Sequence, residues 1–230
     1  SRSASTKLDW TGFIAISLVI TGAQLMMDRG QRLDWFESYE IIGYAALIGI
    51  AGWVFIVHTV THPQPFINPR LFKDRNFVIG LFLVFSYGML TIAPTVLLPS
   101  MLQNLMGYPD SLIGTLLGAR GLGMAIGFLV VGYMGKLDPR IGLIVGIGAI
   151  GLSGWNIAAF NLDVGPWTVA WTGILQGVGS GLMWVPLSIV AFASLPLRLL
   201  PEASSIFHLL RAFGSSIFVS VSVLALVRSG

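Results

Sequence analysis

The sequence predicts an all-α, polytopic helical membrane protein, and both its composition and its apolar stretches point to this class. Of its 230 residues, 55% are hydrophobic and 10% are charged, and the mean hydropathy is +0.83. A soluble domain carries about 25% charged residues, so this chain cannot cover a globule with polar side chains. The composition therefore excludes an ordinary soluble enzyme, a disordered chain and a nucleic-acid-binding domain.

Seven apolar stretches are long enough to cross roughly 30 Å of hydrocarbon, which takes about 17–25 helical residues. They lie at residues 11–27, 41–60, 77–103, 111–134, 141–160, 167–195 and 203–227. Pro94 and Pro99 in the third stretch and Pro186 in the sixth predict kinks, whose freed carbonyls neighbouring helices can satisfy. Glycines recur every four residues in the fourth, fifth and sixth stretches, which predicts close helix contacts there.

The distribution of Lys and Arg predicts the orientation of these spans. The N-terminal segment and the loops 61–76, 135–140 and 196–202 hold eight of these residues, and the opposite side holds three. Because cytoplasmic loops carry an excess of positive charge, we expect the N-terminus in the cytoplasm and the C-terminus of this piece in the periplasm. The chain starts at Ser1 and stops just after an apolar stretch, so we expect it to be a piece of a longer protein.

The two remaining cations, Arg120 and Arg211, lie inside the fourth and seventh stretches. Each is about nine residues into its stretch, roughly 13 Å deep at 1.5 Å per residue. An arginine at that depth costs at least about 2.5–3.5 kcal/mol and normally faces a polar cavity with a partner. All ten acids lie in loops or near the ends of stretches, so none is an evident partner or proton carrier. We interpret the arginines as cavity or latch residues; the alternative is a structural arginine bonded to helix carbonyls.

Four further side chains are candidates for the substrate side of such a cavity. Gln176 and Trp184 share a face of the sixth stretch beside its glycines, and Gln103 lies at the end of the third. His208 precedes Arg211 by three residues and so shares its helical face. It is either a hydrogen-bonding spacer or, because a histidine pKa can lie in the working range, a proton carrier.

The loop between the fourth and fifth stretches carries Lys136, Asp138 and Arg140. We expect these charges to form a cytoplasmic gate; the alternative is that they only follow the positive-inside bias. The chain has no phosphate-binding Gly-Lys-Ser/Thr sequence and no hydrolase motif, so it gives no support for ATP-driven transport or hydrolase chemistry. We also expect no cofactor, no metal and no enzymatic activity.

Two features repeat along the chain. Arg120 and Arg211 both start an Arg-x-x-Gly sequence, and Pro99 and Pro186 precede them at similar places in putative three-helix units. Internal three-plus-three repeats are typical of secondary transporters.

Several motifs together resemble the drug:proton antiporters of the major facilitator superfamily, in their fourteen-helix class (EmrB/QacA type). The matching pieces include Leu8-Asp9-Trp10, Met27-Asp28-Arg29-Gly30, Leu33-Asp34-Trp35, Thr61-His62-Pro63, Leu71-Phe72-Lys73-Asp74-Arg75-Asn76-Phe77, Arg120-Gly121-Leu122-Gly123, Gly177-Val178-Gly179-Ser180-Gly181 and Leu209-Leu210-Arg211. The sequence departs from the family pattern at His208, where Asn is common, and at Met101, where Tyr is common.

The resemblance implies a partial major-facilitator-like bundle of seven spans. Residues 1–62 would form an N-terminal loop and two central linker helices, and residues 63–230 a C-terminal six-helix bundle lacking its last helix. It further implies proton-coupled efflux of hydrophobic drugs across the inner membrane by alternating access, with the proton-carrying acids chiefly in a missing N-terminal bundle. For Gram-negative relatives it implies a periplasmic adaptor and an outer-membrane channel as partners.

Two other functions stay open from the sequence. The chain is alternatively part of an exporter of one metabolite, such as a siderophore or a lipid. It is alternatively an inactive membrane scaffold fragment. A membrane enzyme is a weaker alternative, because no catalytic set of polar residues gathers at one helix end.

Overall fold

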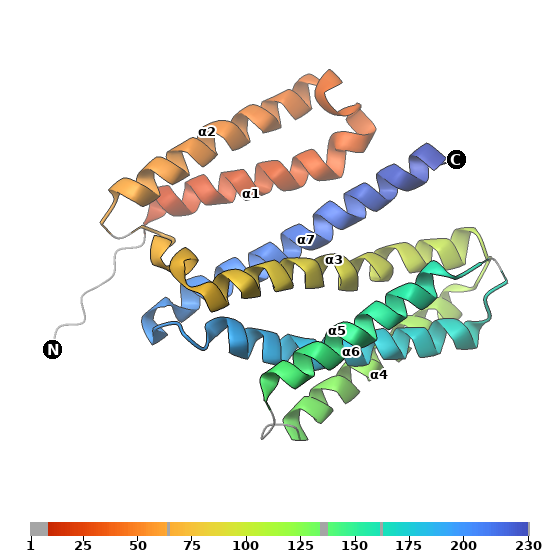
Figure 1. The fold of residues 1–230 in the computed structure, drawn as a ribbon. Coiled ribbons are helices and arrows are strands. Elements are labelled where there is room, and N and C mark those ends of the chain that lie inside the picture. The colour runs from red at the N-terminus through yellow and green to blue at the C-terminus, as the bar shows by residue number, and fades with distance from the viewer. Residues whose placement is uncertain (1–8, 64, 134–137, 162, 230) are drawn as a thin grey trace. The chain divides into compact units, whose positions relative to one another are not determined.

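Seven long helices form the described part of the computed structural model, which covers residues 9–229 apart from 64, 134–137 and 162 (Figure 1). They are α1 (Trp10–Gly30), α2 (Tyr39–Thr61), α3 (Arg75–Asn104), α4 (Asp110–Tyr133), α5 (Pro139–Ala158), α6 (Pro166–Phe192) and α7 (Leu200–Ser229). Short 3-10 helices lie at Gln31–Leu33, Trp35–Glu37, Pro69–Lys73 and Leu197–Leu199. Every long helix is apolar enough to cross a membrane and ends within three residues of a predicted stretch. The predicted all-α membrane fold is confirmed.

The chain divides into two compact units. The first contains the described residues up to Arg75, Leu195–Ile206 and the chain from Ser216 onward. The second contains Asn76–Ser194 and Phe207–Ser215. The predicted boundary between a linker segment 1–62 and a bundle 63–230 stays a prediction.

In the first unit, α1 and α2 pack side by side as a hairpin (Figure 1). The link between them turns at Asp34 and Trp35, whose φ angles of 51° and 53° are left-handed. The Trp35 ring packs against Gly30, where a Cβ would lie 2.9 Å from it. Arg29 Nη1 donates to Glu40 Oε1 at 2.5 Å, which ties the end of α1 to the start of α2. Asp28, Asp34, Glu37 and Glu40 are all exposed at this end of the hairpin.

In the second unit, α6 packs against both α4 and α5, and glycines make this contact close. A Cβ on Gly123 of α4 would overlap the carbonyl oxygen of Ile174, and a Cβ on Gly177 of α6 would overlap that of Arg120. On α5, a Cβ on Gly146 would lie 2.8 Å from the carbonyl oxygen of Gly179. The backbones of the helices therefore touch where the glycine spacing predicts close contacts.

Large apolar side chains cover much of the outer surface of both units. Trp53 of α2 and Trp155 of α5 are 70% and 79% exposed, and Phe82 of α3 is 72% exposed. A soluble monomer rarely exposes so much contiguous apolar surface. Hydrocarbon is therefore the solvent that suits these faces.

The glycine contact predicts an asymmetric effect of adding one methyl group. Gly177→Ala should destabilise the protein by about 1–3 kcal/mol, because overpacking forces the backbones of α4 and α6 apart. The measurement is thermal unfolding of the purified protein in detergent, read by loss of the monodisperse gel-filtration peak. We expect a fall of several degrees in the midpoint.

The matched control is Gly118→Ala on α4, where a Cβ meets nothing within 4 Å. This change should leave the midpoint unchanged or raise it slightly, since Ala favours a helix over Gly by about 1 kcal/mol. Equal midpoints for the two variants would contradict the close contact.

Candidate functional site

A break in the hydrogen-bond ladder of α3 lies at the centre of the candidate site. Pro94 has no backbone N–H, so the carbonyl of Leu90, four residues earlier, loses its helical partner. Gln176 of α6 donates from Nε2 to this carbonyl oxygen at 3.3 Å, and Gln176 is buried. A neighbouring helix therefore satisfies a carbonyl freed by a proline, as the sequence predicts. Gln176 binds α6 to α3.

Arg120 of α4 reaches the same part of α3 from the other side. Its Nη1 donates to Thr95 Oγ1, and its Nη2 donates to the carbonyl oxygen of Thr91 at 2.6 Å. Its Nε is buried without a hydrogen-bond partner among the described residues. Within that part of the chain no carboxylate forms an ion pair with Arg120, so the guanidinium keeps an uncompensated positive charge.

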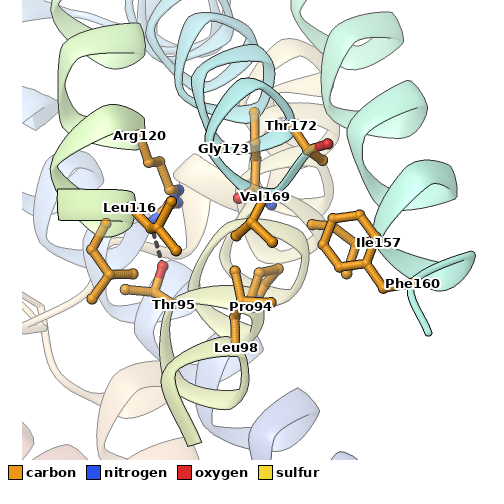
Figure 2. Close-up of a pocket in the computed structure, with 12 residues that line it drawn as sticks. Pro94, Thr95, Leu98, Leu116, Arg120, Ile157, Phe160, Val169, Thr172 and Gly173 are labelled. Carbon is orange, nitrogen blue, oxygen red and sulfur yellow. Dashed lines mark hydrogen bonds between the residues drawn. The ribbon is translucent and has the colours of Figure 1, made fainter. Parts of the chain in front are cut away.

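A small cavity of about 20 Å³ lies between these residues, and Figure 2 shows the side chains that line it. The cavity has about the volume of one water molecule. Its polar lining comes from Thr95, Arg120, Thr172 and Gln176, and apolar residues such as Leu116 and Phe160 form the rest. The cavity is narrow and partly open beside the arginine.

Arg211, on the part of α7 that belongs to the second unit, is held differently. Its guanidinium carbon lies 5.6 Å from the ring centroid of Trp184, within cation–π range. Its Nε is also buried without a hydrogen-bond partner among the described residues. The Trp184 ring packs further against Tyr87, Phe207 and His208 at centroid distances of 5.3, 5.9 and 5.6 Å. Five of the predicted site residues thus form two groups. Arg120 and Gln176 form the first, and Arg211, Trp184 and His208 form the second.

The structure places Gln103 elsewhere. It is exposed at the end of α3, where its Nε2 donates to Asp110 Oδ1 at 2.8 Å across the turn to α4. It does not line the cavity around Arg120. Nothing here tests a role for it in substrate binding.

The predicted gate is described only in part. Asp138 caps α5, because its Oδ1 accepts a hydrogen bond from the backbone N–H of Arg140 at 2.9 Å. Arg140 is exposed, and Lys136 lies outside the described residues. Asp138 therefore has a structural role that its place before Pro139 makes readable, and the gate stays a prediction.

Sequence reasoning missed the threonines around Arg120. Thr95 directly follows Pro94, and hydroxyl side chains near a proline in a membrane helix often satisfy freed backbone groups. That signal could have identified Thr95. Thr172 is 1% exposed and its Oγ1 has no hydrogen-bond partner in the described part of the chain. Nothing in the sequence separates it from a packing residue.

Comparison with known proteins gives relatives along almost the whole chain. Residues 10–219 match the Major Facilitator Superfamily. The chain is 30% identical to the multidrug export protein EmrB of Escherichia coli K12 and 31% identical to the fatty acid resistance protein FarB of Neisseria gonorrhoeae. Each alignment covers 96% of this chain and 44% of the relative. The colistin resistance protein EmrB of Acinetobacter baumannii is 23% identical, covering 91% of this chain and 41% of the relative.

The chain spans less than half the length of these relatives. The seven apolar helices and the relatives together indicate a multi-pass protein of the inner membrane. The superfamily match includes most of α1 to α7 and therefore both groups of site residues. The chain belongs to the Major Facilitator Superfamily, and it is similar along almost its whole length to export proteins of the EmrB type.

Proposed function

We propose that this chain is the C-terminal portion of a proton-coupled exporter that moves hydrophobic drugs out across the inner membrane by alternating access. It is a transporter and not an enzyme in this proposal. The observation that carries it is the uncompensated charge of Arg120, held in mid-helix by oxygens of α3 beside Pro94. A partly buried cation in a membrane span costs free energy when no acid lies beside it. A role in function would explain why the protein has Arg120 there.

The contacts of α3 support a movement of this helix. Pro94 removes one backbone hydrogen bond from α3, Gln176 supplies a bond to the freed carbonyl, and Arg120 binds the next carbonyl along the helix. Side-chain bonds can exchange partners without unfolding a helix, so α3 is able to bend or rock against α4 and α6. Such rocking of one element around a fixed site is how secondary transporters alternate access.

The aromatic group around Trp184 supports an apolar substrate. Tyr87, Trp184 and Phe207 offer rings from three helices. Adaptable apolar and aromatic linings suit hydrophobic ligands, while a few polar groups fix their orientation. Arg211, His208 and Gln103 would be contacts on the substrate side, together with the group around Arg120.

A second candidate is export of anionic amphiphiles such as fatty acids. Both arginines are without an ion-pair partner among the described residues, and a carboxylate on the substrate would supply one. The name of the relative FarB, fatty acid resistance protein, agrees with this chemistry. Export of another single metabolite, such as a siderophore or lipid, or an inactive scaffold, is less supported because no observation favours it.

The remaining parts of the mechanism are also proposals. The N-terminus would lie in the cytoplasm, and Lys136, Asp138 and Arg140 would gate that side. No described span carries a carboxylate near its middle, so proton carriers would lie in the preceding half of the transporter, which the length of the relatives supports. A periplasmic adaptor and an outer-membrane channel would complete the export path.

Arg120→Met tests whether the arginine serves stability or function. Replacing a buried charge by an apolar side chain of similar size is often neutral or stabilising by about 1–4 kcal/mol. We therefore expect an unfolding midpoint in detergent that equals or exceeds that of the wild type. Leu116→Ala, which removes a core side chain of the same cavity, should lower stability by about 2–5 kcal/mol. A large fall for Arg120→Met would support the structural alternative.

Arg120→Met should reduce export even though it should not reduce stability. In efflux-deficient bacteria that express the complete gene, Arg120→Met and Arg211→Met should each reduce export by about tenfold or more, because a charged hydrogen bond contributes about 1.5–3 kcal/mol. The measurement is resistance to several unrelated drugs and to a long-chain fatty acid, with and without a protonophore. Arg32→Met, in the exposed link after α1, is the matched control and should export normally.

The pattern of resistance separates the candidates. Protection against several unrelated drugs, lost with the protonophore, supports the first function. Protection against the fatty acid alone supports the second and contradicts the first. Normal export by Arg120→Met would remove the observation on which the proposal is built.

A further inference from the structure

We propose that Asp9, His58 and His62 form a binding site for one divalent transition-metal ion of the zinc type, where the start of α1 meets the end of α2. These residues belong to the first unit and lie outside the groups around Arg120 and Arg211. From the sequence alone we expect no metal, and that expectation stays untested. The cluster of these three side chains leads us to propose a metal site instead.

The spacing of the two histidines is suited to chelation. His58 lies in the last turn of α2, and His62, four residues later, caps the end of that helix with its backbone N–H bonded to the carbonyl oxygen of His58. Two histidines at this spacing on a helix are a common pair of zinc ligands. Their rings stack with centroids 4.7 Å apart. The end of a helix also favours positive charge, because its free carbonyls give it a negative partial charge.

Asp9 brings the third ligand to this pair. It directly precedes α1, and its Oδ1 lies 2.8 Å from His58 Nε2. One ligand atom from each of the three residues lies within 4.8 Å of the other two. Metal–nitrogen and metal–oxygen bonds of about 2.0–2.2 Å place two ligands no more than about 4.4 Å apart. Small rotations of the side chains are therefore enough to close the three ligands around one ion.

Backbone contacts hold the Asp9 carboxylate in place. Its side chain is 6% exposed, and it accepts hydrogen bonds from the N–H of Gly12 at 3.0 Å and of Phe66 at 2.8 Å. Burial raises the pKa of Asp9, but the bonds from Gly12, His58 and Phe66 lower it more, so the net pKa lies below its usual value. Carboxylates that bind metals are commonly oriented by such outer hydrogen bonds.

The site opens to solvent on one side. Asp9 and His62 line a groove of about 960 Å³, and His62 is exposed. Water can enter there to complete the coordination of an ion with three protein ligands. Arg70, Lys73 and Arg198 line the same groove, so the field does not favour loosely held cations. Binding must come from direct ligation.

The ligand chemistry sets the expected selectivity. Imidazole nitrogen suits Zn²⁺, Ni²⁺ and Co²⁺, whereas Mg²⁺ and Ca²⁺ prefer sites made of oxygen alone. The ion replaces the proton that His58 shares with Asp9. The bound ion would link Asp9, which directly precedes α1, to His58 in the last turn of α2. It would thereby close the open end of the hairpin that α1 and α2 form.

Metal binding to the purified chain tests this proposal. The 230-residue chain is prepared in detergent without a histidine tag, stripped with a chelator and equilibrated with Zn²⁺, and bound metal is counted by mass spectrometry. We expect one Zn²⁺ per chain, visible d–d absorption on titration with Co²⁺, and no displacement by excess Mg²⁺. His58→Gln and His62→Gln should each weaken binding at least about tenfold.

His62→Gln is the decisive variant, because His62 is exposed and Asp9 also holds the start of α1. Gel filtration of each variant verifies folding. His208→Gln, which removes the remaining histidine on α7, is the matched control and should bind zinc as the wild type does. Binding that is equal in the wild type and the His58→Gln/His62→Gln double variant, or that falls equally in His208→Gln, would refute the site. These results do not depend on export.

Discussion

In hydrocarbon, every buried polar group must find a partner inside the protein, and this constraint determines the contacts of α3. Pro94 removes one donor from the ladder of that helix, and Gln176 restores it from α6. Arg120 then adds two donors to the hydroxyl of Thr95 and the carbonyl of Thr91. Polar side chains of two other helices thus bind α3 around one proline, and their positions define the candidate site.

The same constraint is not met fully at either arginine. The Nε atoms of Arg120 and Arg211 are buried without hydrogen-bond partners among the described residues. Such groups usually cost about 1–3 kcal/mol each. A protein that keeps two of them, beside a narrow cavity of about 20 Å³ and an aromatic group, has polar groups in its interior that a ligand could bind. Those groups are what the proposed substrate or a second conformation would use.

Most of the fold could be predicted, because bilayer thickness fixes the helix length and glycine spacing fixes the close contacts of α4, α5 and α6. The positions of Arg120 and Arg211 inside α4 and α7 were readable for the same reason. Contacts across helices were not. Gln103 lies at the end of α3 beside Asp110, and its role on the substrate side stays a prediction. The partners of Arg120 and the approach of Asp9 to His58 depend on how separate helices align. The hydrophobic periodicity of a single sequence does not reveal that alignment.

The helix pairs of the second unit differ in how easily they can separate. Where α4 meets α6, backbone touches backbone at Gly123 and Gly177, and no side-chain movement can relieve or renew that contact. Where α3 meets α4 and α6 near Pro94, long polar side chains supply the bonds. The first contact favours a rigid pair, and the second tolerates sliding by an exchange of partners. Backbone also touches backbone where Gly88 of α3 meets Arg211 and where Gly214 meets Phe85, so a movement of α3 in the proposed transport cycle would carry the adjoining part of α7 with it.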